Sequence, residues 1–248
     1  MPSQDAGLSF VCLGTGRGAT TVYNGEPSSA VALRMDGHDV LLVDIGFGVV
    51  RACQKWLGAI PDTILVTHNH SDHAAELPVV LAAEAASARR LRVAAEPTVG
   101  ARLKAHRLHE LESTGDPLTT FCQWVDTPAG QAWPLTSRLS LCLLRARHSE
   151  PCFGFVASLD GEPILSYGGD SAADTDYYDQ LFAAPNVILD ARATGNDEHA
   201  DFEMVAAYIA TRPAHRVWIT GYGRHDQAPA HMTAIHPGDT ITLGSRAA

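Results

Sequence analysis

Three histidines and one aspartate follow a short apolar run in the stretch ILVTHNHSDH, residues 64–73. The four side chains are those of His68, His70, Asp72 and His73. The apolar run is typical of a buried strand, and a tight loop after such a strand can turn all four side chains toward one point. Neutral imidazoles and carboxylates bind zinc, manganese and iron(II). The order H-x-H-x-D-H is far more constrained than a histidine-rich surface loop requires, so it indicates a metal site.

The elements that would position this site read as strands in clusters with helices between them, a pattern of layered α/β folds. We expect strands at residues 8–13, 31–33, 40–44, 64–66, 139–145, 153–158, 163–167, 187–190 and 217–220. Helical spacing predicts helices at residues 46–58, 78–91 and 201–210. Asp36-Gly37 and Asp160-Gly161 predict hairpin turns. We interpret Cys53, Trp56, Met204 and Trp218 as core residues.

Length alone allows one or two domains, and because no Ser/Gly/Pro-rich linker divides the chain we expect one domain over residues 1–248. The chain has 248 residues, is 46% hydrophobic and carries a formal net charge of −10. Such an acidic chain is a poor general binder of polyanions, because phosphate contact needs clustered cations. One segment runs against the overall charge, with Arg89, Arg90, Arg92, Arg102, Lys104 and Arg107. It is either a solvated helix face or a local patch that attracts an anionic substrate.

The cellular setting is also an expectation from sequence. We find no secretory leader at the N-terminus and no apolar run of membrane-spanning length, so we expect no membrane association. The cysteines are scattered and odd in number, and no CxxC pair occurs: Cys12, Cys53, Cys122, Cys142 and Cys152. They are typical of reduced thiols, which predicts a cytoplasmic protein.

The segment THNHSDHAAELP resembles the signature of the metallo-β-lactamase superfamily, in the branch that contains ribonuclease Z and small-molecule phosphodiesterases. Four other segments resemble that branch in the same order: LGTGRG, SSAVALRMDGHDVLLVDIGFG, RHSEPCFGFVASLDGEPILSYGGDS and DARATGNDEHADF. The resemblance implies the α/β class with an αββα sandwich, in which two mixed sheets pack face to face with helices outside. It also suggests a homodimer.

The resemblance implies a role for each residue of the site. The first metal would be held by His68, His70 and His148. Asp72 and His73 would hold the second metal, and Asp170 would bridge the two. Asp72 and His199 are the candidate catalytic residues, and His199 would act on the leaving group. Asp44 would orient the ligand loop, although a plain turn aspartate is equally compatible with its place beside Gly46.

The chain departs from the family pattern at two places. Family members end their metal set with a histidine after a late strand, where this chain has Gly221. Either His225 reaches back, or the second metal is held weakly, or two-metal chemistry is lost. We favour weak binding and expect Gly221→His to tighten the second metal. The interval 149–169 is also too short for the arm that grips transfer RNA in ribonuclease Z, so we expect no transfer RNA partner.

The sequence therefore predicts a metal-dependent hydrolase, with zinc as the expected metal and manganese or iron also compatible. We favour hydrolysis of a small, anionic phosphodiester by a metal-activated hydroxide, with His199 protonating the leaving oxygen. Hydrolysis of a lactone, ester or thioester at the same site is an open alternative. A degenerate member that only binds a ligand or partner is a second alternative, and Gly221 motivates it.

Overall fold

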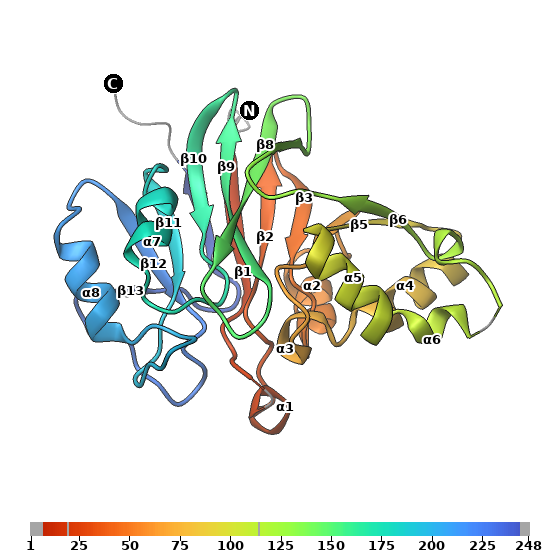
Figure 1. Ribbon diagram of the computed structural model, residues 1–248, viewed down its shortest axis with the longest axis horizontal. Helices are drawn as coiled ribbons and strands as arrows, with labels where there is room; N and C mark the ends of the chain where they lie inside the picture. The colour runs from red at the N-terminus through yellow and green to blue at the C-terminus, as the bar shows by residue number, and fades with distance from the viewer. Residues whose placement is uncertain (1–6, 19, 114, 244–248) are drawn as a thin grey trace.

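Fourteen strands in the described part of the chain form two seven-stranded sheets in this computed structural model, which describes residues 7–18, 20–113 and 115–243. The first sheet has the order β14-β1-β2-β3-β4-β5-β6, and the second has the order β13-β12-β11-β10-β9-β8-β7. In Figure 1 the sheets lie together in the middle, with α7 and α8 on one side and α2, α4, α5 and α6 on the other. The expected αββα sandwich is confirmed.

The first sheet contains β1 (Leu8–Gly14), β2 (Ala30–Met35), β3 (His38–Val43), β4 (Thr63–Leu65), β5 (Leu91–Ala95), β6 (Cys122–Asp126) and β14 (Thr240–Leu243). The second contains β7 (Ala132–Pro134), β8 (Leu139–Ala146), β9 (Cys152–Leu159), β10 (Glu162–Tyr167), β11 (Asn186–Asp190), β12 (Arg216–Thr220) and β13 (Thr233–Ala234). The helices are α1 (Thr20–Asn24), α2 (Val49–Trp56), α3 (Ser71–Ala74), α4 (Leu77–Ala86), α5 (Pro97–His106), α6 (His109–Glu112), α7 (Thr175–Leu181), α8 (Phe202–Ala210) and the 3₁₀ turn η1 (Leu118–Thr120). Within the described residues, no helix combines the length and apolarity needed to cross a membrane.

Both predicted hairpins are confirmed. Asp36 and Gly37 have φ angles of 50° and 82° between the antiparallel strands β2 and β3. Asp160 and Gly161 have φ angles of 53° and 90° between β9 and β10. Two successive positive φ angles define the turn whose twist matches paired strands, and Asp-Gly is a preferred sequence for it.

The polar residues that follow strands meet at one edge because the strands that carry them are parallel. In the first sheet β3, β4, β5 and β6 run parallel, and in the second β10, β11, β12 and β13 do. Asp44 follows β3 and the loop 66–73 follows β4, whereas Asp170 lies three residues after the end of β10 and Asp190 is the last residue of β11. His148 joins them from the connection between β8 and β9.

One apolar core cluster lies between the sheets and draws residues from both, and a second packs α7 and α8 against the second sheet. Phe10 of β1 packs edge-on against Trp218 of β12, with ring centroids 5.3 Å apart. Cys53 and Trp218 are buried as expected. The core assignment was wrong for Trp56 and Met204. They are 39% and 52% exposed, because each lies on the outer face of its helix.

The region after α4 differs from the sequence prediction. The helix expected at residues 78–91 ends at Ala86, and Leu91 opens the parallel strand β5. Ala88 takes a left-handed φ of 59°, which closes the turn between the two elements. The sequence did not reveal where this helix ends, because the run is rich in alanine and has a high helix propensity throughout. Helix propensity carries no information about a turn that tertiary packing imposes. The helices α5 and α6 and the strands β6 and β7 were not predicted.

Gly46 allows the loop after β3 to approach the metal-loop backbone closely. A Cβ added there would lie 1.8 Å from the carbonyl oxygen of Asp72. We expect Gly46→Ala to lower the free energy of unfolding by roughly 1–3 kcal/mol, the usual cost of overpacking, as measured by urea titration. Gly7→Ala is the control, because a Cβ at Gly7 meets nothing within 4 Å, and it should change stability by less than about 0.5 kcal/mol. A small effect of the same size in both variants would contradict the close approach.

Candidate metal centre

The carboxylate of Asp44 anchors the histidine-rich loop at two points. Its Oδ1 accepts the backbone N–H of Thr67 at 2.8 Å, and its Oδ2 accepts the Thr67 hydroxyl at 2.8 Å. His73 Nδ1 lies 2.7 Å from the same Oδ2, so that N–H also donates to Asp44. Asp44 is fully buried and has a left-handed φ of 65°. Asp44 therefore positions the ligand loop, which decides between the two interpretations open at the sequence level.

Thr67 selects the ring nitrogen that His68 presents to the site. Because the Thr67 hydroxyl gives its proton to Asp44, it must accept from His68 Nδ1, which lies 3.0 Å away. The lone pair of His68 is therefore on Nε2, which is buried and has no hydrogen-bond partner among the described residues. Burial holds the pKa of His68 well below its usual range. A buried, neutral imidazole with an unused lone pair is what a metal ligand requires.

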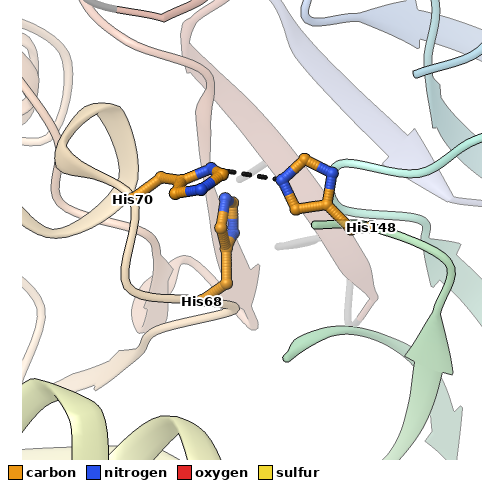
Figure 2. A group of neighbouring side chains, drawn as sticks. All are labelled: His68, His70 and His148. Atoms are coloured by element: carbon orange, nitrogen blue, oxygen red, sulfur yellow. Dashed lines mark hydrogen bonds between the residues drawn. The ribbon is translucent and has the colours of Figure 1, made fainter. Parts of the chain in front are cut away.

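His70 and His148 converge on the same point from different loops (Figure 2). His148 Nε2 lies 3.1 Å from His70 Nδ1, close to the distance of about 3.3 Å between two nitrogens that share a tetrahedral zinc ion. The backbone carbonyl of Glu198 lies 3.1 Å from His148 Nδ1 and accepts its N–H, which leaves the lone pair of His148 on Nε2. Burial lowers the pKa of His148, so this imidazole is also neutral.

Asp170 and His73 form a buried pair on the other side of His68. Asp170 Oδ1 lies 3.3 Å from His73 Nε2, and Asp72 Oδ2 lies 3.6 Å from the same nitrogen. Burial alone would lower the pKa of His73, but the carboxylates of Asp170, Asp44 and Asp72 hold it well above its usual range. Burial alone would raise the pKa of Asp170, but His73 holds it well below its usual range. The carboxylates therefore favour positive charge at this point.

The imidazole of His199 lies at the border of this cluster and beside a second carboxylate. Its Nδ1 is 2.8 Å from Asp190 Oδ2, 3.8 Å from Asp170 Oδ2 and 2.6 Å from an Arg192 nitrogen. A carboxylate can only accept and a guanidinium can only donate, so Nδ1 satisfies one of these two neighbours at a time. Burial and the nearby Asp170 raise the pKa of Asp190, which is fully buried.

Five of the six predicted ligands, together with the predicted catalytic residue His199, form three overlapping groups, and within each group the donor atoms lie within 4.8 Å of one another. These groups are His68, His70 and His148; His68, His73 and Asp170; and His148, Asp170 and His199. Asp72 belongs to none of them, and its Oδ2 accepts the backbone N–H of Gly18 at 2.5 Å. The neutral imidazoles, the carboxylates and the unpartnered His68 Nε2 suit a divalent metal such as zinc.

Gly221 supplies no histidine to the predicted second metal site, and His225 does not replace it. His225 is exposed and hydrogen-bonded through Nε2 to Asn24 Oδ1 at 3.3 Å, away from the cluster. Gly221 has a φ of 69°, and a Cβ added there would lie 2.1 Å from Asp190 Oδ1. A histidine at this position would have to displace the Asp190 carboxylate. The expected tightening of the second metal by Gly221→His is therefore unsupported by the geometry.

Sequence reasoning missed three residues that shape the centre, namely Thr67, Asp190 and Arg192. Thr67 stands directly before the first histidine, and Asp190 ends a buried strand, as Asp44 nearly does. A polar residue at the carboxyl end of a buried strand was the available signal for both. Arg192 had no signal, because only packing brings it beside His199.

Comparisons with known proteins agree with the fold. A family described as "Beta-lactamase superfamily domain" matches residues 40–243, whereas no curated protein sequence matches. The metallo-beta-lactamase fold protein YhfI from Bacillus subtilis aligns with a TM-score of 0.73 and 14% identity over 96% of this chain and 100% of that chain. The short form of human tRNase Z aligns with a TM-score of 0.70 and 20% identity over 96% and 100% of the two chains.

A diphosphatase from the PhnP family aligns with a TM-score of 0.71 and 15% identity over 94% of this chain and 97% of that chain. At such identities the three structures establish the fold. The family match extends over most of the chain and includes the H-x-H-x-D-H loop. The chain therefore belongs to the metallo-β-lactamase superfamily of hydrolases.

Proposed function

We propose that this protein is a metal-dependent hydrolase that cleaves a small phosphodiester. The observation that carries the proposal is the buried Nε2 of His68, which has no hydrogen-bond partner in the described part of the chain and lies between His70 and His148 on one side and His73 and Asp170 on the other. Leaving a buried polar atom unpaired costs about 1–3 kcal/mol, so a structure that holds one among further ligands is built to receive an ion.

His68, His70, His148 and Asp170 would hold one metal ion. Asp72, His73 and Asp170 would hold a second ion more weakly, because Gly221 supplies no ligand and His225 lies elsewhere. Zinc is the expected ion, with manganese or iron(II) compatible with the same donors. Divalent ions in such a centre act as Lewis acids and lower the pKa of a bound water.

His199 would donate a proton to the leaving oxygen. Its Nδ1 faces Asp190 and Arg192, whereas its Nε2 has no hydrogen-bond partner among the described residues. Asp190 fixes the orientation of the ring, and a positioned acid typically contributes about 10²–10⁴-fold to the rate. Nε2 is therefore the atom that we assign to proton transfer.

Three observations support a small phosphorus substrate. The interval between His148 and Asp170 is filled by the hairpin of β9 and β10, which leaves no length for an inserted arm. The net charge of −10 disfavours a large polyanion. Two of the similar structures are named as a tRNase Z and as a diphosphatase, and both names refer to phosphorus chemistry.

A substrate panel tests the proposal. Bis-aryl phosphates, cyclic nucleotides, lactones and thioesters should be offered to protein purified without chelator and loaded with zinc or manganese. We expect turnover of the phosphodiesters, and inhibition by a chelator that is reversed by added metal. Turnover of lactones or thioesters alone would assign the centre to carbonyl substrates. A protein that binds no metal and hydrolyses none of the panel would be a binding member of the family.

We expect His70→Ala to abolish hydrolysis and to lower bound zinc while the far-ultraviolet circular dichroism stays native. The reason is that His70 is a half-buried loop residue that supplies one of the donor atoms. Metal content by mass spectrometry and a chelator competition measure the loss. His225→Ala is the matched control and should keep both metal and activity, because this imidazole is exposed. Full metal content in His70→Ala would remove His70 from the ligand set.

We expect His199→Ala to reduce turnover by about 10²–10⁴-fold while metal content changes little. The loss should be smaller for a nitrophenyl ester of phosphate than for an alkyl ester, because nitrophenolate leaves without protonation. Steady-state rates on the two substrates measure the difference. Equal losses on both would argue against an acid role, and release of zinc would make His199 a ligand, as its distance to Asp170 allows.

A further inference from the structure

Several cations of the basic segment Arg89–Arg107 are engaged by other protein groups. The guanidinium of Arg89 is paired with Asp62 and Glu84. Lys104 lies over the Trp124 ring, 4.3 Å from its centroid. Arg107 differs from both, because it turns toward the loop that carries the histidines. Of these three cations, Arg107 is therefore the one that contacts the histidine-rich loop.

Arg107 makes three hydrogen bonds to the residues on either side of His70. Its Nε donates to Asn69 Oδ1 at 3.2 Å, and one terminal nitrogen donates to the Asn69 backbone carbonyl at 2.9 Å. The same terminal nitrogen donates to Ser71 Oγ at 2.9 Å. Arg107 caps the C-terminal end of α5 and is half-buried, so its side chain starts from a fixed element. The planar guanidinium thus spans the position of His70 from outside the loop.

His70 needs such support more than the other histidines do. Thr67 orients His68, Asp44 orients His73, and the Glu198 carbonyl orients His148. Within the described residues, the His70 imidazole has a hydrogen-bond partner only in His148, which is itself a ligand. A ligand that lacks an orienting partner on its ring must be held through its backbone.

We propose that Arg107 is a positioning residue that holds His70 in place for the metal, an inference that rests on the proposed function. The sign of its effect separates positioning from electrostatics. A guanidinium near the site repels a dication, so removing its charge alone would tighten metal binding. Removing a positioning group would instead weaken binding, because the loop would lose the conformation in which His70 points at the metal.

The helix α5 makes a second, weaker contact with the ligand loops. Arg102 lies 3.3 Å from a Glu150 carboxylate oxygen, two residues beyond His148. The Arg102 side chain is 47% exposed, and ion pairs at exposed positions contribute little. We therefore expect substitution of Arg107 to change the zinc affinity strongly and substitution of Arg102 to change it little.

The zinc affinity of metal-free protein, measured by competition with a chromophoric chelator, tests the inference. We expect Arg107→Ala to weaken zinc binding by about 10–100-fold, the usual effect of removing a group that orients a ligand. Arg107→Lys should recover part of the loss, because an ammonium can still reach one acceptor. Lys104→Ala removes the same charge from the same helix without touching the loop, and it should leave affinity unchanged or slightly higher.

Ser71→Ala provides a test that changes no charge. It removes one acceptor of the Arg107 guanidinium, and we expect a smaller but measurable weakening of zinc binding. The visible spectrum of the cobalt(II) protein should also change in Arg107→Ala, because it reports the ligand geometry rather than stability. If Arg107→Ala fails to fold, Arg107→Lys and Ser71→Ala decide the question in its place.

The possible results distinguish a failure of the positioning role from a failure of the proposed function. Zinc binding by wild type together with equal or tighter binding by Arg107→Ala would overturn the positioning role alone. Unchanged affinity in both Arg107→Lys and Ser71→Ala would overturn it as well. Absence of zinc binding in the wild-type protein would overturn the proposed metal centre, and the positioning role with it.

Discussion

The rest of the centre depends on the hydrogen bonds that the buried carboxylate of Asp44 accepts. It receives hydrogen bonds from the Thr67 backbone, the Thr67 hydroxyl and the His73 ring, and so joins the end of β3 to the loop after β4 and to α3. Its left-handed backbone is a conformation that costs about 1–3 kcal/mol and persists only where the surroundings enforce it. Burial raises the pKa of Asp44, while the positive charge of His73 and these hydrogen bonds oppose that rise.

Hydrogen bonds that start at Asp44 determine the orientation of the histidine rings. The Thr67 hydroxyl, held by Asp44, orients His68, and the direct hydrogen bond to Asp44 orients His73 on the other side of the loop. His148 and Asp170 come from the second sheet, so the centre is complete only when the two sheets have packed against each other. Metal binding is then coupled to folding, because the unfolded chain holds no such arrangement of ligands.

The parts of this protein that could be predicted from its sequence are those with a local signal. The histidine-rich loop is contiguous, and each Asp-Gly hairpin depends on two adjacent residues. The contacts that residues make through long-range packing gave no such signal. Asp190 contacts His199 and lies beside Gly221 only because the fold brings these residues together. In the same way, only the fold places Arg107 next to the loop that carries Asn69, which is far away in the sequence. The segment around β6 was missed for another reason, since its strand is short and only partly buried and so lacks a clear alternation.

The most direct test of the central claim is a crystal structure of protein grown with zinc, with diffraction data collected on both sides of the zinc absorption edge. We expect an anomalous difference peak at bonding distance from His68 Nε2 and within reach of His70, His148 and Asp170, together with a weaker peak beside His73. We also expect the Asp44 contacts to Thr67 and His73 to be unchanged by the metal. A map without a peak at His68, or with a water hydrogen-bonded to its Nε2 in zinc-saturated crystals, would contradict the assignment of these residues to a metal centre.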